Sequence, residues 1–383
     1  MNIEANVLQR YADAAVEREA ALCCPVSYDP QYLNVIPQEV LDRDYGCGDP
    51  SAFVKEGETV LDLGSGGGKI CFIASQVVGP NGRVLGVDFN PAMLDLARRS
   101  QSQVAEAVGY DNVTFLRGRI QDLTTNVDLV DSDLVEMPIC SAGDYLSFVD
   151  RLRAASDADP LVASDSVDVI VSNCVLNLVH SADKRILFDE MMRVLKPGGR
   201  VAISDIVSDE KVPDHLRADA DLWSGCISGA FQERDFIEAF ERAGFYGICI
   251  EKRDDTPWRV VEGIEFRSVT VTAYKGKEGP CLERNQAVIY PGPWSEVRDD
   301  DGHIFQRGVS VAVCDKTFKI LTREPYDAQT IAVSPRIDIP LEEAASFECG
   351  KMAVRHPRVT KGWEYAETNE ERPSACGPDE SCC

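Results

Sequence analysis

Apolar strand-like runs and amphipathic helix-like segments alternate from about residue 57 to residue 275, and this alternation constrains the fold more than any other feature. Such alternation is typical of a parallel sheet that is covered by helices on both faces. The predicted strands cover residues 59–63, 84–88, 113–117, 167–172, 200–204, 247–252 and 268–274, and the predicted helices cover residues 69–78, 91–108, 180–195 and 232–243. The sequence therefore predicts an α/β fold.

Other segments flank or interrupt this pattern. A predicted helix over residues 3–24, stopped by Pro25, makes residues 1–50 an N-terminal helical segment and lid. The main domain, residues 51–275, carries an acidic insertion at about 126–165, which we expect to form a surface embellishment. Short β-rich runs at 286–290, 309–313 and 317–321 predict a smaller, β-rich C-terminal α+β domain over residues 276–373, and the cysteine-rich tail, residues 374–383, is expected to be disordered.

The charge and the apolar pattern exclude several classes of partner. A formal net charge of −25 argues against binding to nucleic acid or to an anionic membrane surface, since both would repel the chain. No apolar run reaches the roughly 18 residues that a spanning helix needs. The first residues lack the basic start and apolar stretch of a secretory signal. We therefore expect a cytoplasmic monomer that acts on a small molecule.

A glycine-rich turn, residues 62–68, joins the first predicted strand to the first helix. Glycines let a backbone approach a ligand closely, without a clash from Cβ. A dinucleotide loop needs its third glycine later, where the helix packs against a pyrophosphate-bound turn. Asp62, at the strand end, would instead attract the cationic amino-acid end of S-adenosylmethionine. The loop therefore favours a methyltransferase over a dehydrogenase.

Residues after later strands complete the predicted cofactor site. Asp88 ends the second strand, where a carboxylate can accept hydrogen bonds from ribose hydroxyls. Ile120 and Gln121 would flank the adenine, and Asn173 lies in the exit loop of the fourth strand. The predicted cofactor-binding residues are Asp62, Gly64, Ser65, Gly66, Gly68, Asp88, Phe89, Ile120, Gln121 and Asn173. Together with a Pro-Gly-Gly turn at 197–199, they predict a Rossmann-like class I methyltransferase sheet.

The chain contains 14 cysteines, a large number for its length. A chain of this size needs no disulfide scaffold, and in a cytosolic protein such thiols are more often metal-binding or catalytic. No Cys-x-x-Cys spacing occurs and the four histidines form no cluster in the sequence, so a structural zinc site is poorly supported.

Four of these cysteines, Cys47, Cys71, Cys174 and Cys226, are predicted to gather at the edge of the sheet where the cofactor binds. Soft thiolates suit soft centres, and three of them can hold a trivalent metalloid as a pyramid with a free lone pair. That lone pair can attack a sulfonium methyl without a general base, once both reactants are held at near-attack distance. Any single cysteine could equally be an inert packing residue.

The motifs around these cysteines resemble those of arsenite S-adenosylmethionine methyltransferases. The resemblance covers residues 40–275 well and rests on residues 45–48, the glycine loop with Cys71, residues 172–178 and residues 223–230. It implies that Cys174 and Cys226 hold trivalent arsenic, with Cys71 as the further ligand. It also implies that Cys47 and Cys71 take part in binding inorganic arsenite and in redox recycling, so that Cys47, Cys71, Cys174 and Cys226 form the catalytic set.

The same resemblance implies methylated arsenicals as products of arsenic detoxification, with thioredoxin or glutathione as the reductant. The Cys23-Cys24-Pro25 stretch and the terminal cysteines suggest a bacterial subgroup, with arsenosugar synthesis as one route that it would feed. Arsenite, methylarsenite and antimonite all stay open as acceptors. The alternatives are a small-molecule C-, N- or O-methyltransferase, which would need a base near the methyl group, and a non-catalytic thiol-based metalloid-binding protein.

Overall fold

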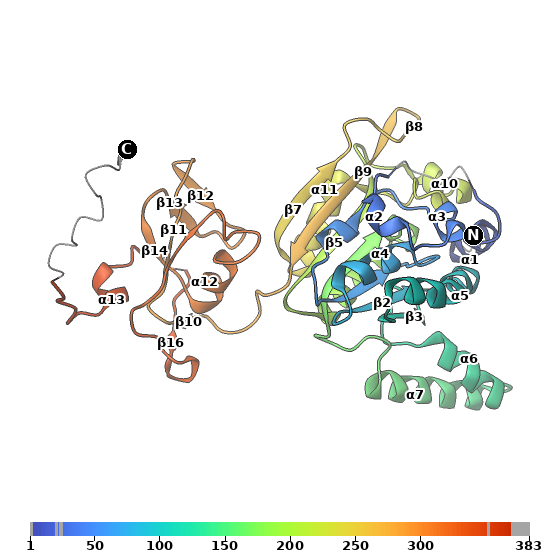
Figure 1. Cartoon of the computed structure of the whole chain (residues 1–383), viewed down its shortest axis with the longest axis horizontal. Coiled ribbons are helices and arrows are strands. Elements are labelled where there is room, and N and C mark those ends of the chain that lie inside the picture. Colours follow the sequence, from blue (N-terminus) through green and yellow to red (C-terminus); the bar gives the residue numbers. More distant parts are fainter. Residues whose placement is uncertain (1–2, 20–21, 23–25, 351–352, 369–383) are drawn as a thin grey trace. The chain divides into compact units, whose positions relative to one another are not determined.

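The computed structural model describes residues 3–19, 22, 26–350 and 353–368, and it forms two compact units (Figure 1). The first unit comprises residues 1–276 and the second comprises residues 277–383. The predicted tail and the Cys23-Cys24-Pro25 stretch lie outside the described residues. Within the described ranges, none of the helices combines the length and the apolar character that crossing a bilayer requires.

A twisted sheet forms the centre of the first unit, with the strand order β3-β2-β1-β4-β5-β9-β7. Strands β1 to β5 run parallel, and β9 lies antiparallel between β5 and β7. The strands are β1 (Thr59–Leu63), β2 (Arg83–Asp88), β3 (Val113–Arg117), β4 (Val167–Asn173), β5 (Leu195–Ser208), β6 (Phe231–Gln232), β7 (Tyr246–Arg253), β8 (Arg259–Val261) and β9 (Ile264–Tyr274). The strand order reverses direction between β1 and β4, which is where an open α/β sheet binds its ligand.

Helices cover both faces of this sheet (Figure 1), and the predicted α/β class is confirmed. One apolar core packs α4 (Lys69–Val78) and α5 (Pro91–Val108) on one face, and a second packs α8 (Lys184–Val194) and α11 (Glu233–Ala243) on the other. The central strands are nearly continuous apolar runs because both of their faces are buried. The remaining short helices are α2 (Pro30–Leu33), α3 (Gln38–Asp42), η2 (Pro50–Phe53), η3 (Leu176–Leu178), α9 (Asp214–Arg217) and α10 (Ala220–Ser224).

The first helix is shorter than the sequence predicts. Helix α1 spans Ile3–Ala14, whereas the apolar spacing predicts a helix over 3–24. The side chains of Arg10 and Glu19 are hydrogen-bonded at 3.0 Å (Nε to Oε1), although they lie nine residues apart. Nine residues of continuous helix would separate the two backbone positions by roughly 13 Å. The chain therefore turns back after α1, so that the charged segment 17–19 lies beside the helix.

The acidic insertion forms two helices, α6 (Val127–Glu136) and α7 (Ala142–Ala158), each capped at its start by the side chain of the preceding Asn126 or Ser141. Arg98 pairs with Asp128 at 3.0 Å, Arg117 pairs with Asp131, and Arg151 links α7 to Asp133 of α6 at 2.8 Å. The insertion is thus attached to the β3 edge of the sheet largely by surface ion pairs.

The second unit is built mostly from short strands, in keeping with the β-rich prediction. Strands β14, β11 and β15 form an antiparallel sheet, while β10 pairs with β16 and β12 pairs with β13. Its elements are β10 (Leu282–Glu283), β11 (Ala287–Ile289), β12 (Glu296–Arg298), β13 (Ile304–Gln306), β14 (Ser310–Ala312), α12 (Asp315–Leu321), β15 (Ile331–Val333), η4 (Leu341–Glu343), β16 (Ala345–Ser346) and α13 (Pro357–Lys361).

The prediction of a β-rich run at residues 317–321 is wrong, because these residues belong to helix α12. The Cys314 side chain accepts a hydrogen bond from the backbone N–H of Thr317 and caps the helix. Thr317, Ile320 and Leu321 are buried, and this spacing places them on one helical face. A short apolar run is compatible with a strand and with a buried helix. Here the cap that Cys314 provides favours the helix.

Candidate cofactor and thiol site

A cavity of about 430 Å³ opens at the carboxyl ends of β1, β2 and β4. Nine of the ten predicted cofactor residues line it, namely Asp62, Gly64, Ser65, Gly66, Asp88, Phe89, Ile120, Gln121 and Asn173. Gly68 does not line the cavity. It precedes α4 with a φ of 90°, and a Cβ there would lie 2.8 Å from the Phe115 ring. Gly68 therefore serves the packing of α4 against the sheet.

The glycine loop provides a cradle that side chains would fill or strain. Gly64 and Gly66 have φ values of 75° and 51°, a region that residues with a Cβ rarely adopt. A Cβ at Gly64 would also lie 2.5 Å from Val175. The Ser65 hydroxyl is buried and has no hydrogen-bond partner within the described structure, so a polar ligand atom would satisfy it. These features fit S-adenosylmethionine.

Two carboxylates face this cavity, Asp62, which is buried, and Asp88, which is partly buried. Burial raises the pKa of Asp62 to about 7, and its Oδ2 atom accepts a hydrogen bond from the Cys71 thiol at 3.2 Å. Burial also raises the pKa of Asp88, whose carboxylate accepts hydrogen bonds from the backbone N–H groups of Gly66 (2.8 Å) and Asn90 (2.7 Å). A bound cationic ligand would favour the ionised form of both acids.

Helix α1 forms a wall of the cavity and joins its two ends. Near the cofactor residues, Asn90 donates a hydrogen bond to the Leu8 carbonyl (3.0 Å) and Arg119 pairs with Glu4 (2.8 Å). At the other end, the Tyr11 hydroxyl lies 3.8 Å from the Cys226 sulfur. The same helix therefore touches both the expected cofactor half and the thiol half of the site.

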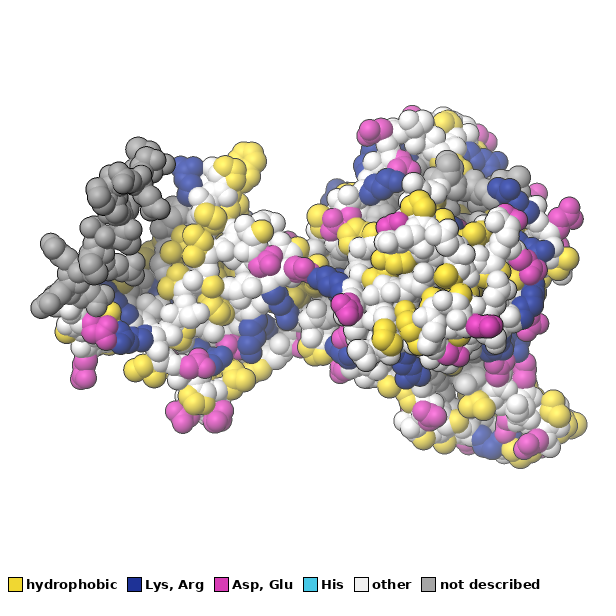
Figure 2. Space-filling model, viewed as in Figure 1, with side chains coloured by type: hydrophobic (Ala, Val, Ile, Leu, Met, Phe, Trp, Pro, Cys, Tyr) yellow, Lys and Arg dark blue, Asp and Glu magenta, His cyan; other side chains and the backbone are white. Residues whose placement is uncertain are grey.

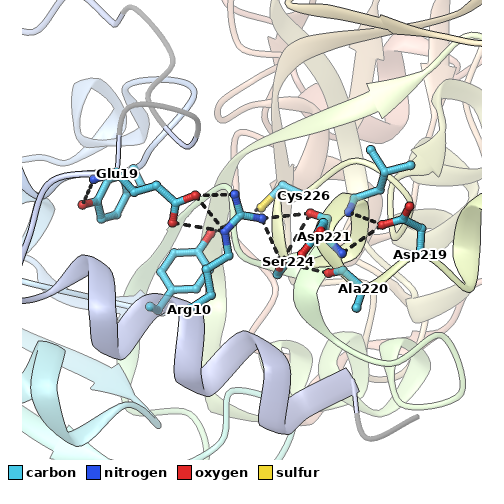
Figure 3. Close-up of polar contacts among 10 residues, drawn as sticks. Arg10, Glu19, Asp219, Ala220, Asp221, Ser224 and Cys226 are labelled. Carbon is cyan, nitrogen blue, oxygen red and sulfur yellow. Dashed lines mark hydrogen bonds and ion pairs between the residues drawn. The ribbon is translucent and has the colours of Figure 1, made fainter.

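Figure 3 shows how α1 is attached to α10. Arg10 donates hydrogen bonds to the Asp221 carbonyl at 2.9 Å and to the Ser224 hydroxyl at 2.8 Å, and it pairs with Glu19 at 2.5 Å. Cys226 lies two residues after Ser224. The guanidinium therefore links the N-terminal segment to the loop that carries one of the predicted catalytic cysteines.

Three of the four predicted cysteines converge. The Cys47 and Cys174 sulfurs and a carboxylate oxygen of Asp205 lie within 4.8 Å of one another. The Cys226 thiol donates a hydrogen bond to the Cys174 carbonyl at 3.1 Å. Hydrogen bonding with the thiols of Cys226 and then Cys47, with burial, raises the pKa of Cys174 well above its usual value. All three cysteines belong to one apolar cluster at the strand ends.

Cys71 is not part of this thiol group, contrary to the predicted convergence of all four cysteines. It is fully buried in the core that packs α4 against the sheet, where its thiol contacts Asp62. Burial, followed by the Asp62 charge, raises its pKa well above the ordinary value. The sulfur that lies near Cys174 in its place is that of Cys47.

Cys174 and Cys226 both have strained backbones. Their φ values are 65° and 60°, in the left-handed region that disfavours residues with a side chain. The Cys174 N–H donates to the Ser204 carbonyl at 2.8 Å, and the Cys226 N–H donates to the Trp223 carbonyl at 3.0 Å. Strain of this kind clusters at functional sites, where the surrounding structure enforces it.

Asn173 holds the Cys47 loop in place. Its side-chain oxygen accepts from the N–H groups of Cys47 (2.8 Å) and Gly48 (3.0 Å), while its nitrogen donates to the Gly48 carbonyl (2.7 Å). A Cβ at Gly46 would lie 2.1 Å from the Asn173 amide. Asn173 therefore positions a thiol as well as lining the cofactor cavity, a role that the sequence did not reveal.

The acidic residue Asp205 was missed by the sequence reasoning. It interrupts the apolar run of β5, and an acid within a buried strand is the signal that points to it. Burial raises its pKa to about 6, and its oxygens accept from the Leu176 N–H (2.9 Å) and the Asn177 amide (2.8 Å). Burial also lowers the pKa of the neighbouring Lys184 to about 8. Asp205 thus fixes the turn that follows Cys174.

On the face that Figure 2 shows, the acidic side chains do not gather into a single patch. In Figure 2, Lys and Arg side chains lie among these Asp and Glu side chains. Surface charge pairs of this kind contribute little to stability individually.

Comparisons with known proteins extend over both units. A family described as a methyltransferase domain matches residues 54–154 and 147–244, and a domain of unknown function (DUF8838) matches residues 277–365. An arsenite methyltransferase from Aquipseudomonas alcaligenes is 32% identical over 338 residues, which cover 84% of this chain and 86% of that protein.

Two further relatives bear on the fold. An arsenite methyltransferase from Homo sapiens is 28% identical over 395 residues, covering 98% of this chain and 93% of that protein. The crystal structure of an arsenic(III) S-adenosylmethionine methyltransferase from Chlamydomonas reinhardtii matches with a TM-score of 0.54 at 26% identity, over 84% of this chain and 100% of that chain. The Rossmann-like methyltransferase sheet is therefore shared with a solved structure.

Proposed function

Because the chain belongs to the arsenite methyltransferase family, we propose that it transfers the methyl group of S-adenosylmethionine to trivalent arsenic held by Cys47, Cys174 and Cys226. The observation that carries this assignment is the position of Cys174, which lines the cofactor cavity, lies beside the Cys47 sulfur and accepts a hydrogen bond from the Cys226 thiol at its carbonyl.

Binding of the substrate is an exchange of ligands on arsenic. Arsenous acid loses three hydroxides, each of which leaves as water with one thiol proton, while three As–S bonds form and arsenic stays trivalent. Burial raises the pKa of Cys47, so this thiol carries its proton before the exchange. Since that proton leaves in water, the exchange needs no separate base.

When bound, S-adenosylmethionine supplies a methyl group on a positively charged sulfur. The protein holds the two reactants close together and keeps water out of the thiol cluster. Asp62 and Asp88 attract the cationic ligand, and Asn173 and Asp205 fix the backbones that carry Cys47 and Cys174. Bound S-adenosylmethionine would supply its methyl group to the lone pair of the arsenic that these thiols hold, with an As–C bond forming as the S–C bond breaks.

This bond formation oxidises arsenic by two electrons, and a thiol reductant must return them before another methyl group can be added. Thioredoxin and glutathione both have the required chemistry. A monomeric state, a cytoplasmic location and a contribution to arsenic detoxification belong to the same proposal.

The proposal is tested by incubating the purified chain with arsenite, a dithiol and S-adenosylmethionine that carries a labelled methyl group. Chromatography coupled to elemental mass spectrometry should find the label on monomethylated arsenic. Label on an organic acceptor, without any methylated arsenic, would instead favour a small-molecule C-, N- or O-methyltransferase. Arsenite that is bound but never methylated would indicate a metalloid-binding protein.

A further inference from the structure

The second unit contains its own cluster of three thiols. The Cys281, Cys314 and Cys349 sulfurs all lie within 4.8 Å of one another. They come from positions 33 and 35 residues apart along the chain (314 − 281 and 349 − 314), so the fold and not a local motif brings them together. None of the three lines the cofactor cavity of the first unit.

The local fold explains how these sulfurs meet. Strand β10 pairs antiparallel with β16, so that Leu282 faces Ser346, and the Phe347 N–H donates to the Cys281 carbonyl at 2.9 Å. This pairing brings the segments that carry Cys281 and Cys349 alongside each other. Cys314 is buried at the start of α12, where its sulfur lies 3.2 Å from the Thr317 hydroxyl.

Neighbouring groups lower the pKa of one of the three thiols, that of Cys281. The Cys349 thiol hydrogen-bonds to Cys281 and lowers the pKa of Cys281, and the Lys316 charge acts in the same direction. Cys281 is partly exposed, which leaves one side of the cluster open to a small molecule.

Simple packing does not account for this arrangement, because two of the three cysteines, Cys281 and Cys349, are only partly buried. Zinc in a structural site takes four ligands in a tetrahedron, whereas this cluster offers three donors within the described residues. A trivalent metalloid takes three thiolates as a pyramid. We propose that the C-terminal unit binds one trivalent arsenical through Cys281, Cys314 and Cys349, separately from the methylation site.

Binding of arsenous acid to these three thiols needs no oxidant and no reductant. Three As–O bonds of arsenous acid and three S–H bonds break, three As–S bonds form, and three waters leave. Arsenic remains trivalent throughout. The cluster thus retains substrate on the chain.

The test uses the full chain with Cys174→Ser and Cys226→Ser, which remove the first thiol site, and with Cys376, Cys382 and Cys383 changed to serine. Equilibrium dialysis against arsenite should find about one arsenic per chain, and X-ray absorption should show three sulfur neighbours. Adding Cys281→Ser and Cys349→Ser should remove the bound arsenic. Cys140→Ser, at an exposed thiol of the acidic insertion, should leave it unchanged.

A second measurement needs no variant of the cluster. Arsenite should protect Cys281 and Cys349 of the unaltered chain from alkylation, as read by peptide mass spectrometry, and leave exposed Cys140 reactive. The proposal is overturned if the cluster variants still bind one arsenic, if the cluster holds zinc that arsenite does not displace, or if arsenite fails to protect Cys281 and Cys349. Because this site is separate from the methylation site, methylation of arsenic by the cluster variants would leave the proposed function intact.

Discussion

Two cysteines, Cys174 and Cys226, occupy backbone positions at which glycine would be less strained. Both positions carry cysteine, which is expected if the thiol itself is required. The sequence placed both residues near the cofactor loop, since each follows a strand or lies in a segment beyond one. It did not reveal their left-handed backbone, because no local pattern in the sequence requires it.

We expect Cys174→Gly to be more stable than Cys174→Ala by about 1 kcal/mol, since both lack the thiol and only alanine retains the left-handed strain. Both variants should be inactive on arsenite. Urea unfolding of the two proteins measures the difference. Equal or reversed stabilities would show that the strain at Cys174 is absent in solution.

Asp62 should make cofactor binding depend on pH. Its pKa is raised to about 7, and its ionised form attracts the cationic ligand. The ionised fraction falls as pH drops below 7, so the affinity for S-adenosylmethionine should be weaker at pH 6 than at pH 8, by up to about tenfold.

Calorimetry across this pH range measures the dependence. Asp62→Asn should bind weakly at every pH and lose the dependence, while Asp157→Asn, at an exposed position in α7, should match the unaltered chain. An unchanged pH dependence in Asp62→Asn would assign the titration to another group.

Among the elements, α1 shows what the sequence could and could not predict. Apolar spacing predicted its existence, but not its end at Ala14, after which the chain turns back so that Glu19 contacts Arg10. The strands were located to within a few residues because their apolar runs are strong, although β5 extends well beyond 200–204. At α12, a run too short to show a period was assigned to the wrong element.

If α1 encloses the site, Arg10→Ala should raise the KM for both S-adenosylmethionine and arsenite. We expect each KM to rise by about tenfold, because charged hydrogen bonds contribute roughly 1.5–3 kcal/mol each. Gln9→Ala is the matched control, since the Gln9 side chain donates a hydrogen bond to exposed Asp13 of the same helix. Hydrogen exchange should show faster opening of α1 in Arg10→Ala alone. Unchanged kinetic constants would contradict the role of α1 as a wall of the site.

At the scale of the whole molecule, the alternation of strands and helices predicted the sheet and the edge at which the ligand binds. Topology brings strand ends together, but it does not determine the direction of each side chain. Cys71 follows the correct loop and yet points into the core beside Asp62. Cys47, the least constrained by sequence, is held by Asn173 against Cys174.

All the residues that line the cofactor cavity belong to the first unit. The two apolar cores that cover the faces of its sheet are also formed by residues of this unit. We therefore expect residues 1–276 alone to fold and to bind S-adenosylmethionine with an affinity within about threefold of the full chain. Calorimetry and thermal unfolding compare the two. A fragment that folds but does not bind would show that residues beyond 276 complete the cofactor site.

The most direct test of the thiol cluster is a single-turnover measurement of labelled methyl transfer to arsenite by Cys174→Ser, Cys226→Ser and the exposed-thiol control Cys249→Ser. We predict that the first two variants bind S-adenosylmethionine normally but form no methylated arsenic, and that Cys249→Ser reacts like the unaltered chain. Methyl transfer at the unaltered rate in either Cys174→Ser or Cys226→Ser would contradict the assignment.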